Sequence, residues 1–114
     1  MKTLLATTAL VLASASSMAS TLLTLSYKVT IVGCEEYVVA CDNARYFGVN
    51  RKTGESLTLS GRSLHNPGPD GITPARLLGY EFKSGNTTYF VGADGLLRIS
   101  QGSKILVEQQ GTWE

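Results

Sequence analysis

The stretch LLGYEFKSGNTTYFVGADGLLRIS, residues 77–100, decides the fold of this chain. Apolar and polar residues alternate along it, and small or polar turn residues interrupt the alternation twice. A two-residue turn at Gly85-Asn86 would pair the flanking segments as antiparallel strands and set Phe82 opposite Tyr89. This pattern predicts a hairpin with aromatic residues on one face of a sheet.

The second connection of this stretch fixes which residues face the core. A three-residue loop, Ala93-Asp94-Gly95, sets Val91 opposite Leu97. A two-residue turn would instead set Val91 opposite the charged Arg98. Because a slip of one residue moves every side chain to the other face, we expect the three-residue loop, with Gly95 in the left-handed conformation. The predicted core face is Tyr80, Phe82, Tyr89, Val91, Leu97 and Ile99.

The rest of the chain repeats this hairpin pattern, with Gly, Asn, Asp and Ser punctuating short alternating segments. The sequence therefore predicts an all-β domain, a small antiparallel β-barrel or a two-sheet sandwich of about eight strands built from consecutive hairpins. The predicted strands are Leu22–Val32, Tyr37–Cys41, Arg45–Val49, Ser56–Leu59, Leu77–Lys83, Thr87–Gly92, Leu96–Ser100 and Lys104–Gln109.

Two further connections have expected forms. Residues 50–55, which include Gly54, are expected to form a hairpin loop. The turn around Gly102 permits two registers, one with Ile105 and Val107 inside and one with Leu106 inside. The first register is expected because it buries two β-branched residues.

The first nineteen residues have the layout of a secretory signal peptide. Met1-Lys2 gives a positive start, Thr3–Ala13 is apolar, and Ser17 and Ala19 are small residues suited to a cleavage site. Cleavage after Ala19 would leave residues 20–114 as a single small domain. The predicted location is the periplasm or the exterior of a bacterial cell, with no membrane span in the mature chain.

The two cysteines, Cys34 and Cys41, are expected to form a disulfide, because an exported chain meets an oxidising compartment. An alternative remains, since Ile31-Val32-Gly33-Cys34 has the local form of a lipoprotein box. Acylation at Cys34 would anchor the protein to a membrane and leave Cys41 without its partner.

Charge and composition argue against several function classes. Removal of the leader takes away Lys2, which leaves nine Lys and Arg against nine Asp and Glu. A chain of zero net charge without a basic run is not expected to bind nucleic acid. One histidine and a bonded cysteine pair give no zinc site, and no calcium-loop motif is present. We expect neither a metal nor a cofactor.

The histidine, His65, is the one residue on which an enzyme hypothesis can rest. Ser63 is near it in sequence but lies in no nucleophile motif, and no carboxylate is linked to it by a known spacing. The protein is therefore expected not to be an enzyme. A small hydrolase that uses His65 is kept as an alternative.

The segment Ser60–Pro74 holds all three prolines and is predicted to be a long irregular loop. Such loops are either functional or merely mobile, and both readings are open here. If the loop binds a partner, its candidate contact residues are Arg62, His65, Asn66 and Asp70.

These features together favour a non-catalytic binding or inhibitor-type protein of the cell envelope, whose partner is another protein or an envelope component. The hexamer Ser84–Tyr89 is faintly similar to the Ser-Gly-x-x-Tyr loop of exported inhibitors of c-type lysozyme, which are small β-barrels. The spacing here is one residue longer, the Trp and Lys-Gly segment of that family does not follow, and the cysteine positions differ. The likeness covers six residues and assigns no family.

A structural or assembly component of an envelope or surface complex is the alternative function. Exposed edge strands and zero net charge would favour the addition of a strand from another chain.

Overall fold

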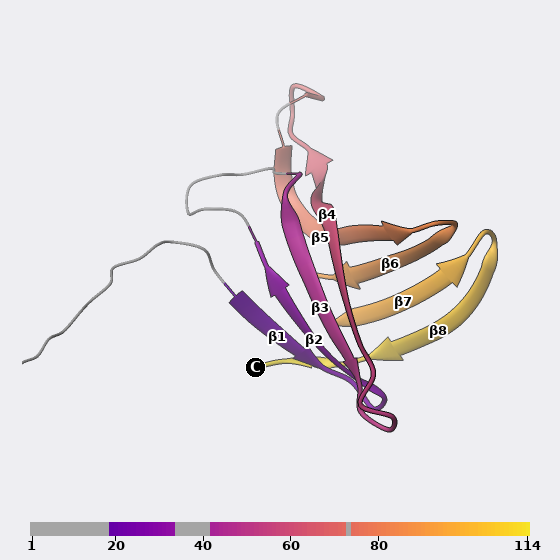
Figure 1. The fold of residues 1–114 in the computed structure, drawn as a ribbon. Coiled ribbons are helices and arrows are strands. Elements are labelled where there is room, and N and C mark those ends of the chain that lie inside the picture. Colours follow the sequence, from indigo (N-terminus) through magenta and orange to yellow (C-terminus); the bar gives the residue numbers. More distant parts are fainter. Residues whose placement is uncertain (1–18, 34–41, 73) are drawn as a thin grey trace, which may run out of the picture.

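The computed structural model describes residues 19–33, 42–72 and 74–114, and in these residues the chain is all strand and turn (Figure 1). The strands are β1 (Ala19–Leu23), β2 (Tyr27–Val32), β3 (Ala44–Asn50), β4 (Ser56–Pro67), β5 (Pro74–Ser84), β6 (Thr87–Gly92), β7 (Leu96–Gln101), β8 (Lys104–Gln110) and β9 (Thr112–Trp113).

All nine described strands belong to one antiparallel sheet in which each strand from β1 to β7 pairs with the next in sequence. The sheet order is β8-β7-β6-β5-β4-β3-β2-β1-β9. Because β9 continues the path of β8 and pairs with β1, the two ends of the sheet approach each other and the barrel is nearly closed. The prediction of an all-β fold built from consecutive hairpins is confirmed, and the single sheet has the barrel-like form.

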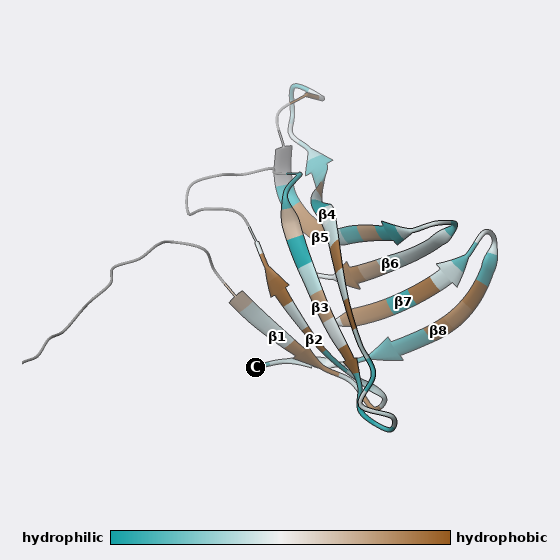
Figure 2. Ribbon diagram, in the orientation of Figure 1, coloured by the Kyte–Doolittle hydropathy of each residue, from teal (hydrophilic) through white to brown (hydrophobic). Residues whose placement is uncertain are grey.

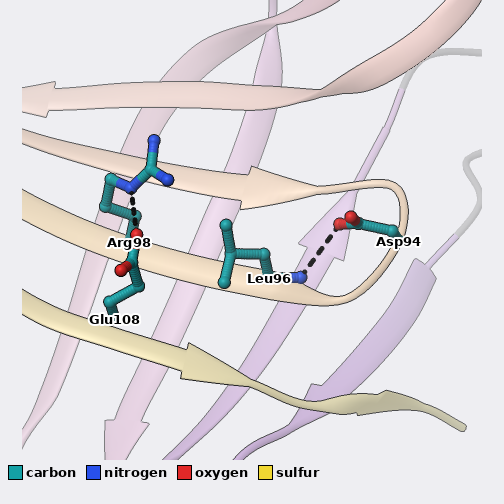
Figure 3. Close-up of polar contacts among 4 residues, drawn as sticks. All are labelled: Asp94, Leu96, Arg98 and Glu108. Atoms are coloured by element: carbon teal, nitrogen blue, oxygen red, sulfur yellow. Dashed lines mark hydrogen bonds and ion pairs between the residues drawn. The ribbon is translucent and has the colours of Figure 1, made fainter.

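The register predicted for residues 77–100 is confirmed. Phe82 pairs with Tyr89 across the β5–β6 turn, and Val91 pairs with Leu97 across the β6–β7 loop. Gly95 has a φ of 97°, the left-handed conformation that the three-residue loop requires. Figure 3 shows how the loop is held, with the Leu96 N–H donating a hydrogen bond to Asp94 Oδ1 at 3.2 Å.

The register of β8 was only half predicted. Val107 packs against the core as expected, but Ile105 is exposed and pairs with Ser100 on the outer face. A shift between Ile99 and Ser100 leaves Leu106 as an extra residue in β8. This bulge interrupts the alternation of side chains, so Ile105 and Val107 point to opposite faces of the sheet. Arg98 Nε donates to Glu108 Oε2 at 2.7 Å beyond the bulge, on the outer face (Figure 3).

Two predicted segment boundaries were wrong, and one predicted strand lies outside the described residues. Leu22–Val32 is not one strand but parts of β1 and β2, since the chain turns at residues 24–26. The predicted loop Ser60–Pro74 is mostly strand, because β4 continues to Pro67 and β5 begins at Pro74. The predicted strand Tyr37–Cys41 is not among the described residues.

The core lies inside the barrel and collects the inward-facing residues of the strands. Figure 2 shows apolar and polar residues in alternating bands along the ribbons, as expected for strands with one buried face. Two rings stand at its centre, Tyr46 and Phe82, whose centroids are 5.3 Å apart. The buried apolar residues are Leu22, Val29, Ile31, Ala44, Tyr46, Phe82, Val91, Leu97 and Ile99.

The predicted leader, except for its last residue Ala19, and both cysteines lie outside the described residues. Ala19 is the first residue of β1 and pairs with Val32. Cleavage after Ala19 would therefore cut the chain directly after the first residue of β1. In the described ranges, no helix has the length and apolar character needed to cross a membrane.

Candidate functional site

Two features could bind a partner, and they lie at opposite ends of β4. The first is a two-stranded ribbon that extends beyond the barrel (Figure 1). Strand β4 pairs with β3 only as far as Gly61, and β5 pairs with β6 only from Gly79 onward. Among the described strands, residues 62–67 therefore pair with β5 alone and residues 74–78 with β4 alone, and we call these two segments the β4–β5 ribbon. At its base, residues 62–64 pair with residues 79–81, which also pair with β6.

The ribbon leaves the barrel through an irregular register. Leu64 pairs with Gly79 and His65 with Leu77, so Leu78 has no opposite residue. The Leu78 carbonyl accepts a hydrogen bond of 2.9 Å from the Ala93 N–H, which ties the base of the ribbon to the β6–β7 loop. Proline is tolerated at residue 67 because, among the described strands, β5 alone pairs with β4 there and no further strand needs the missing donor.

The tip of the ribbon, residues 68–72, is held by its own hydrogen bonds. The Gly71 N–H donates to the Gly68 carbonyl at 2.9 Å, which closes a turn, and Gly71 has a φ of 75°. The Ile72 N–H donates to Asp70 Oδ1 at 2.9 Å. Ile72 itself is 84% exposed. An apolar side chain therefore stands in solvent on a tip with defined geometry.

The four predicted contact residues all belong to the ribbon or its tip, but they do not form one cluster. Arg62 is at the base, on the outer face, where its guanidinium lies 3.2 Å from Glu81 Oε1. His65 is half-buried in mid-ribbon, Asn66 is exposed next to it, and Asp70 is at the tip. Arg62 and Glu81 also line a shallow hollow of about 330 Å³ that includes Asp42 and Lys83.

The described residues of the ribbon contain no cluster of metal ligands. In the described ranges of the chain, no three His, Cys, Asp or Glu side chains gather as ligands for an ion. The isolated ion pair between exposed Arg62 and the partly exposed Glu81 contributes little stability, since water screens such pairs.

The second feature is a cavity of about 490 Å³ at the other end of the barrel, between the β3–β4 hairpin and strands β6 to β8. We call it the tyrosine-lined cavity. It is lined by three aromatic residues (Tyr27, Tyr46, Tyr89), four polar ones (Asn50, Glu55, Ser56, Thr87), and Gly48, Leu57, Ile99, Leu106 and Val107.

Tyr46 lies deepest among the three tyrosines and is only 1% exposed. Its ring centroid is 5.4 Å from that of Tyr89. Its hydroxyl lies over Gly48, where an added Cβ would be 2.5 Å from the Tyr46 oxygen. The glycine therefore makes the space that the phenol occupies.

The Tyr46 hydroxyl has no hydrogen-bond partner among the described residues. Burial raises the pKa of Tyr46, and the nearby Tyr89 and Tyr27 raise it further. Burial and Tyr27 also raise the pKa of Tyr89. The hydroxyls of Tyr46 and Tyr89 thus stay protonated at neutral pH and can both donate and accept.

Two exposed leucines stand among the lining residues of the cavity. Leu57 on β4 is 38% exposed and Leu106 in the β8 bulge is 46% exposed, and both line the cavity. The sequence analysis assigned no function to this end of the barrel. One signal was present, because Tyr46 and Gly48 are inward neighbours on the same strand face and a glycine there leaves space inside.

The hexamer Ser84–Tyr89 spans the β5–β6 turn, and its Thr87 and Tyr89 line the cavity. Comparisons of this chain with protein-family models, with curated proteins and with solved structures give no match.

Proposed function

We propose that this protein is an exported, non-catalytic binding protein that docks on another protein or an envelope component through the tip of the β4–β5 ribbon. The observation that carries the proposal is Ile72, an isoleucine that is 84% exposed on a tip braced by two hydrogen bonds. An exposed apolar anchor on a defined loop is typical of a residue that inserts into a pocket of a partner.

The construction of the ribbon supports this role. Pro67 and Pro69 fix two backbone φ angles near the tip, and the hydrogen bond from Ile72 to Asp70 removes further freedom. A tip that is already ordered loses little entropy when it binds. The exposed Asn66 and Asp70 beside the anchor would supply the polar rim of such a contact.

The test compares two substitutions of equal exposure at opposite ends of the fold. Ile72 and Leu25 are both 84% exposed, Ile72 on the ribbon tip and Leu25 in the β1–β2 turn. The wild-type protein is used to capture partners from envelope extract, and the affinity of each captured protein is then measured by surface plasmon resonance. We expect Ile72→Ser to weaken the binding at least about tenfold and Leu25→Ser to leave it unchanged.

Equal binding by wild type and Ile72→Ser would contradict the proposal. Loss of binding in Leu25→Ser alone would instead locate the contact surface at the β1–β2 turn, at the other end of the barrel. Lysozyme can be tested directly, since unchanged muramidase activity at a large molar excess of the protein rejects c-type lysozyme as the partner.

A second candidate function, assembly through strand addition, is favoured by the edge of β8. Among the described strands only β7 pairs with Lys104–Gln110, so the other edge of β8 has no strand beside it. The bulge at Leu106 and the charge of Lys104 oppose indiscriminate pairing at this edge. Light scattering after gel filtration tests the idea, because a protein that stays monomeric at several hundred micromolar does not assemble through β8 with itself.

A further inference from the structure

We infer that the tyrosine-lined cavity binds an uncharged amphiphile, with a hydroxyl or amide group hydrogen-bonded to Tyr46 and an aliphatic body between Leu57 and Leu106. This site is separate from the ribbon tip, so the inference does not depend on the function proposed for the tip.

The first observation is the buried hydroxyl of Tyr46. Tyr46 as a whole residue is 1% exposed, and its hydroxyl has no hydrogen-bond partner within the described parts of the chain. A buried polar group that no protein group satisfies costs free energy unless water or a bound molecule supplies the hydrogen bond. Tyr46 lines the cavity and has Tyr89 beside it, so a polar group entering the cavity would meet hydroxyls that donate and accept.

The second observation is the combination of size and wall chemistry. A volume of about 490 Å³ falls within the range of small-molecule sites in proteins. Leu57 and Leu106 are exposed at the rim, and Ile99 and Val107 line the interior. An aliphatic body placed there would cover apolar surface that otherwise faces water.

Charge limits the head group of the ligand. The described lining residues include no lysine, arginine or histidine, and Glu55 is the charged residue among them. A carboxylate or phosphate would lose its hydration without gaining a cationic partner. A tyrosine hydroxyl is neutral at physiological pH, and burial raises the pKa of Tyr46 further above that range. An uncharged head therefore fits the lining, whereas an anionic head does not.

The test uses two probes of equal chain length, octan-1-ol and sodium octanoate, with backbone amide NMR shifts as the readout. We expect octan-1-ol to shift the amides of Gly48, Leu57 and Thr87, and octanoate to bind at least about tenfold more weakly at pH 7. Tyr46→Phe should weaken octan-1-ol about fivefold, the value of one ordinary hydrogen bond. Tyr80→Phe is the matched control, because Tyr80 packs against the core but does not line the cavity.

A second pair of variants tests the aliphatic wall. Leu57→Trp should fill the rim and abolish the octan-1-ol shifts, whereas Thr58→Trp, on the exposed outer face of the same strand, should leave them. Equal binding of octanoate and octan-1-ol overturns the inference. So do unchanged affinity in Tyr46→Phe and shifts confined to residues outside the cavity, such as the ribbon tip.

Discussion

The Thr24 hydroxyl donates a hydrogen bond of 2.8 Å to Gln109 Oε1, although 85 residues separate the two in sequence. The same oxygen accepts the Ser26 N–H at 3.1 Å, and Gln109 Nε2 donates to Ser26 Oγ at 2.9 Å. Among the described strands, β8 and β1 do not pair directly, so this amide joins β8 to the β1–β2 turn. The Gln109 side chain thus connects β8 to the β1–β2 turn at a place where no backbone hydrogen bonds of the sheet join β8 to β1.

Gln109→Ala should lower the free energy of unfolding by about 1–3 kcal/mol, because it removes the acceptor of a Thr24 side chain that is 3% exposed. Urea unfolding followed by circular dichroism measures the change. The control is Gln101→Ala, an exposed position on β7, where a change within about 0.5 kcal/mol is expected. Equal effects of the two substitutions would show that Gln109 does not close the barrel.

Trp113 makes a second closure, since its Nε1–H donates to the Ala93 carbonyl at 3.0 Å while its ring packs against the core. Trp113→Phe should cost about 1–2 kcal/mol, because it removes the hydrogen bond and part of the packed ring. Trp113→Ala should cost about 2–4 kcal/mol, because packing is lost as well. Thermal unfolding of both variants measures the two losses, and a phenylalanine variant as unstable as the alanine variant would contradict a contribution from ring packing.

The β5–β6 and β6–β7 hairpins could be predicted because each had one register that buried the apolar face. At the β6–β7 connection, the wrong loop length would have set Val91 against Arg98, and the structure has the loop that avoids this. Local turn chemistry and face alternation are sufficient where strands adjacent in sequence are also adjacent in the sheet.

The ribbon and the cavity could not be predicted in the same way. Proline-rich sequence around residues 66–74 predicted a loop, but a strand tolerates proline where it has few neighbours, and that depends on how far β3 and β6 extend. The cavity depends on Tyr46, Tyr89 and Leu106 meeting from three strands distant in sequence. The bulge that turns Leu106 toward the cavity gave no signal in the alternation pattern.

Gly61 marks the point where β4 changes its partner from β3 to β5, and the backbones approach closely there. A Cβ on Gly61 would lie 2.1 Å from the Glu81 carbonyl oxygen, which cannot move without breaking the β4–β5 pairing. Gly61→Ala should therefore destabilise the fold by about 3 kcal/mol or more. Ser60→Ala, at the exposed neighbouring position, should change stability by less than about 0.5 kcal/mol. Urea midpoints of both proteins provide the measurement, and a Gly61→Ala midpoint at the wild-type value would contradict the close approach.

Stability should fall at alkaline pH because burial raises the pKa values of Tyr46, Tyr80 and Tyr89 in the folded state. A free tyrosine loses its proton near pH 10. Above that pH the unfolded chain binds fewer protons than the folded one, so the free energy of unfolding decreases as pH rises. Below about pH 9 these three tyrosines should not make the free energy of unfolding depend on pH.

Tyr46 should dominate this dependence, since it is the most deeply buried of the three. Urea unfolding between pH 8 and pH 12, with tyrosinate absorbance at 295 nm as a second readout, measures the slope and the ionisation together. We expect a flatter decline above pH 10 in Tyr46→Phe than in the wild type, and a smaller change in Tyr80→Phe. If Tyr46→Phe keeps the wild-type slope, the Tyr46 hydroxyl ionises as readily in the folded protein as in the unfolded chain. The burial of Tyr46 beneath the cavity argues against that outcome, because burial disfavours the charged phenolate.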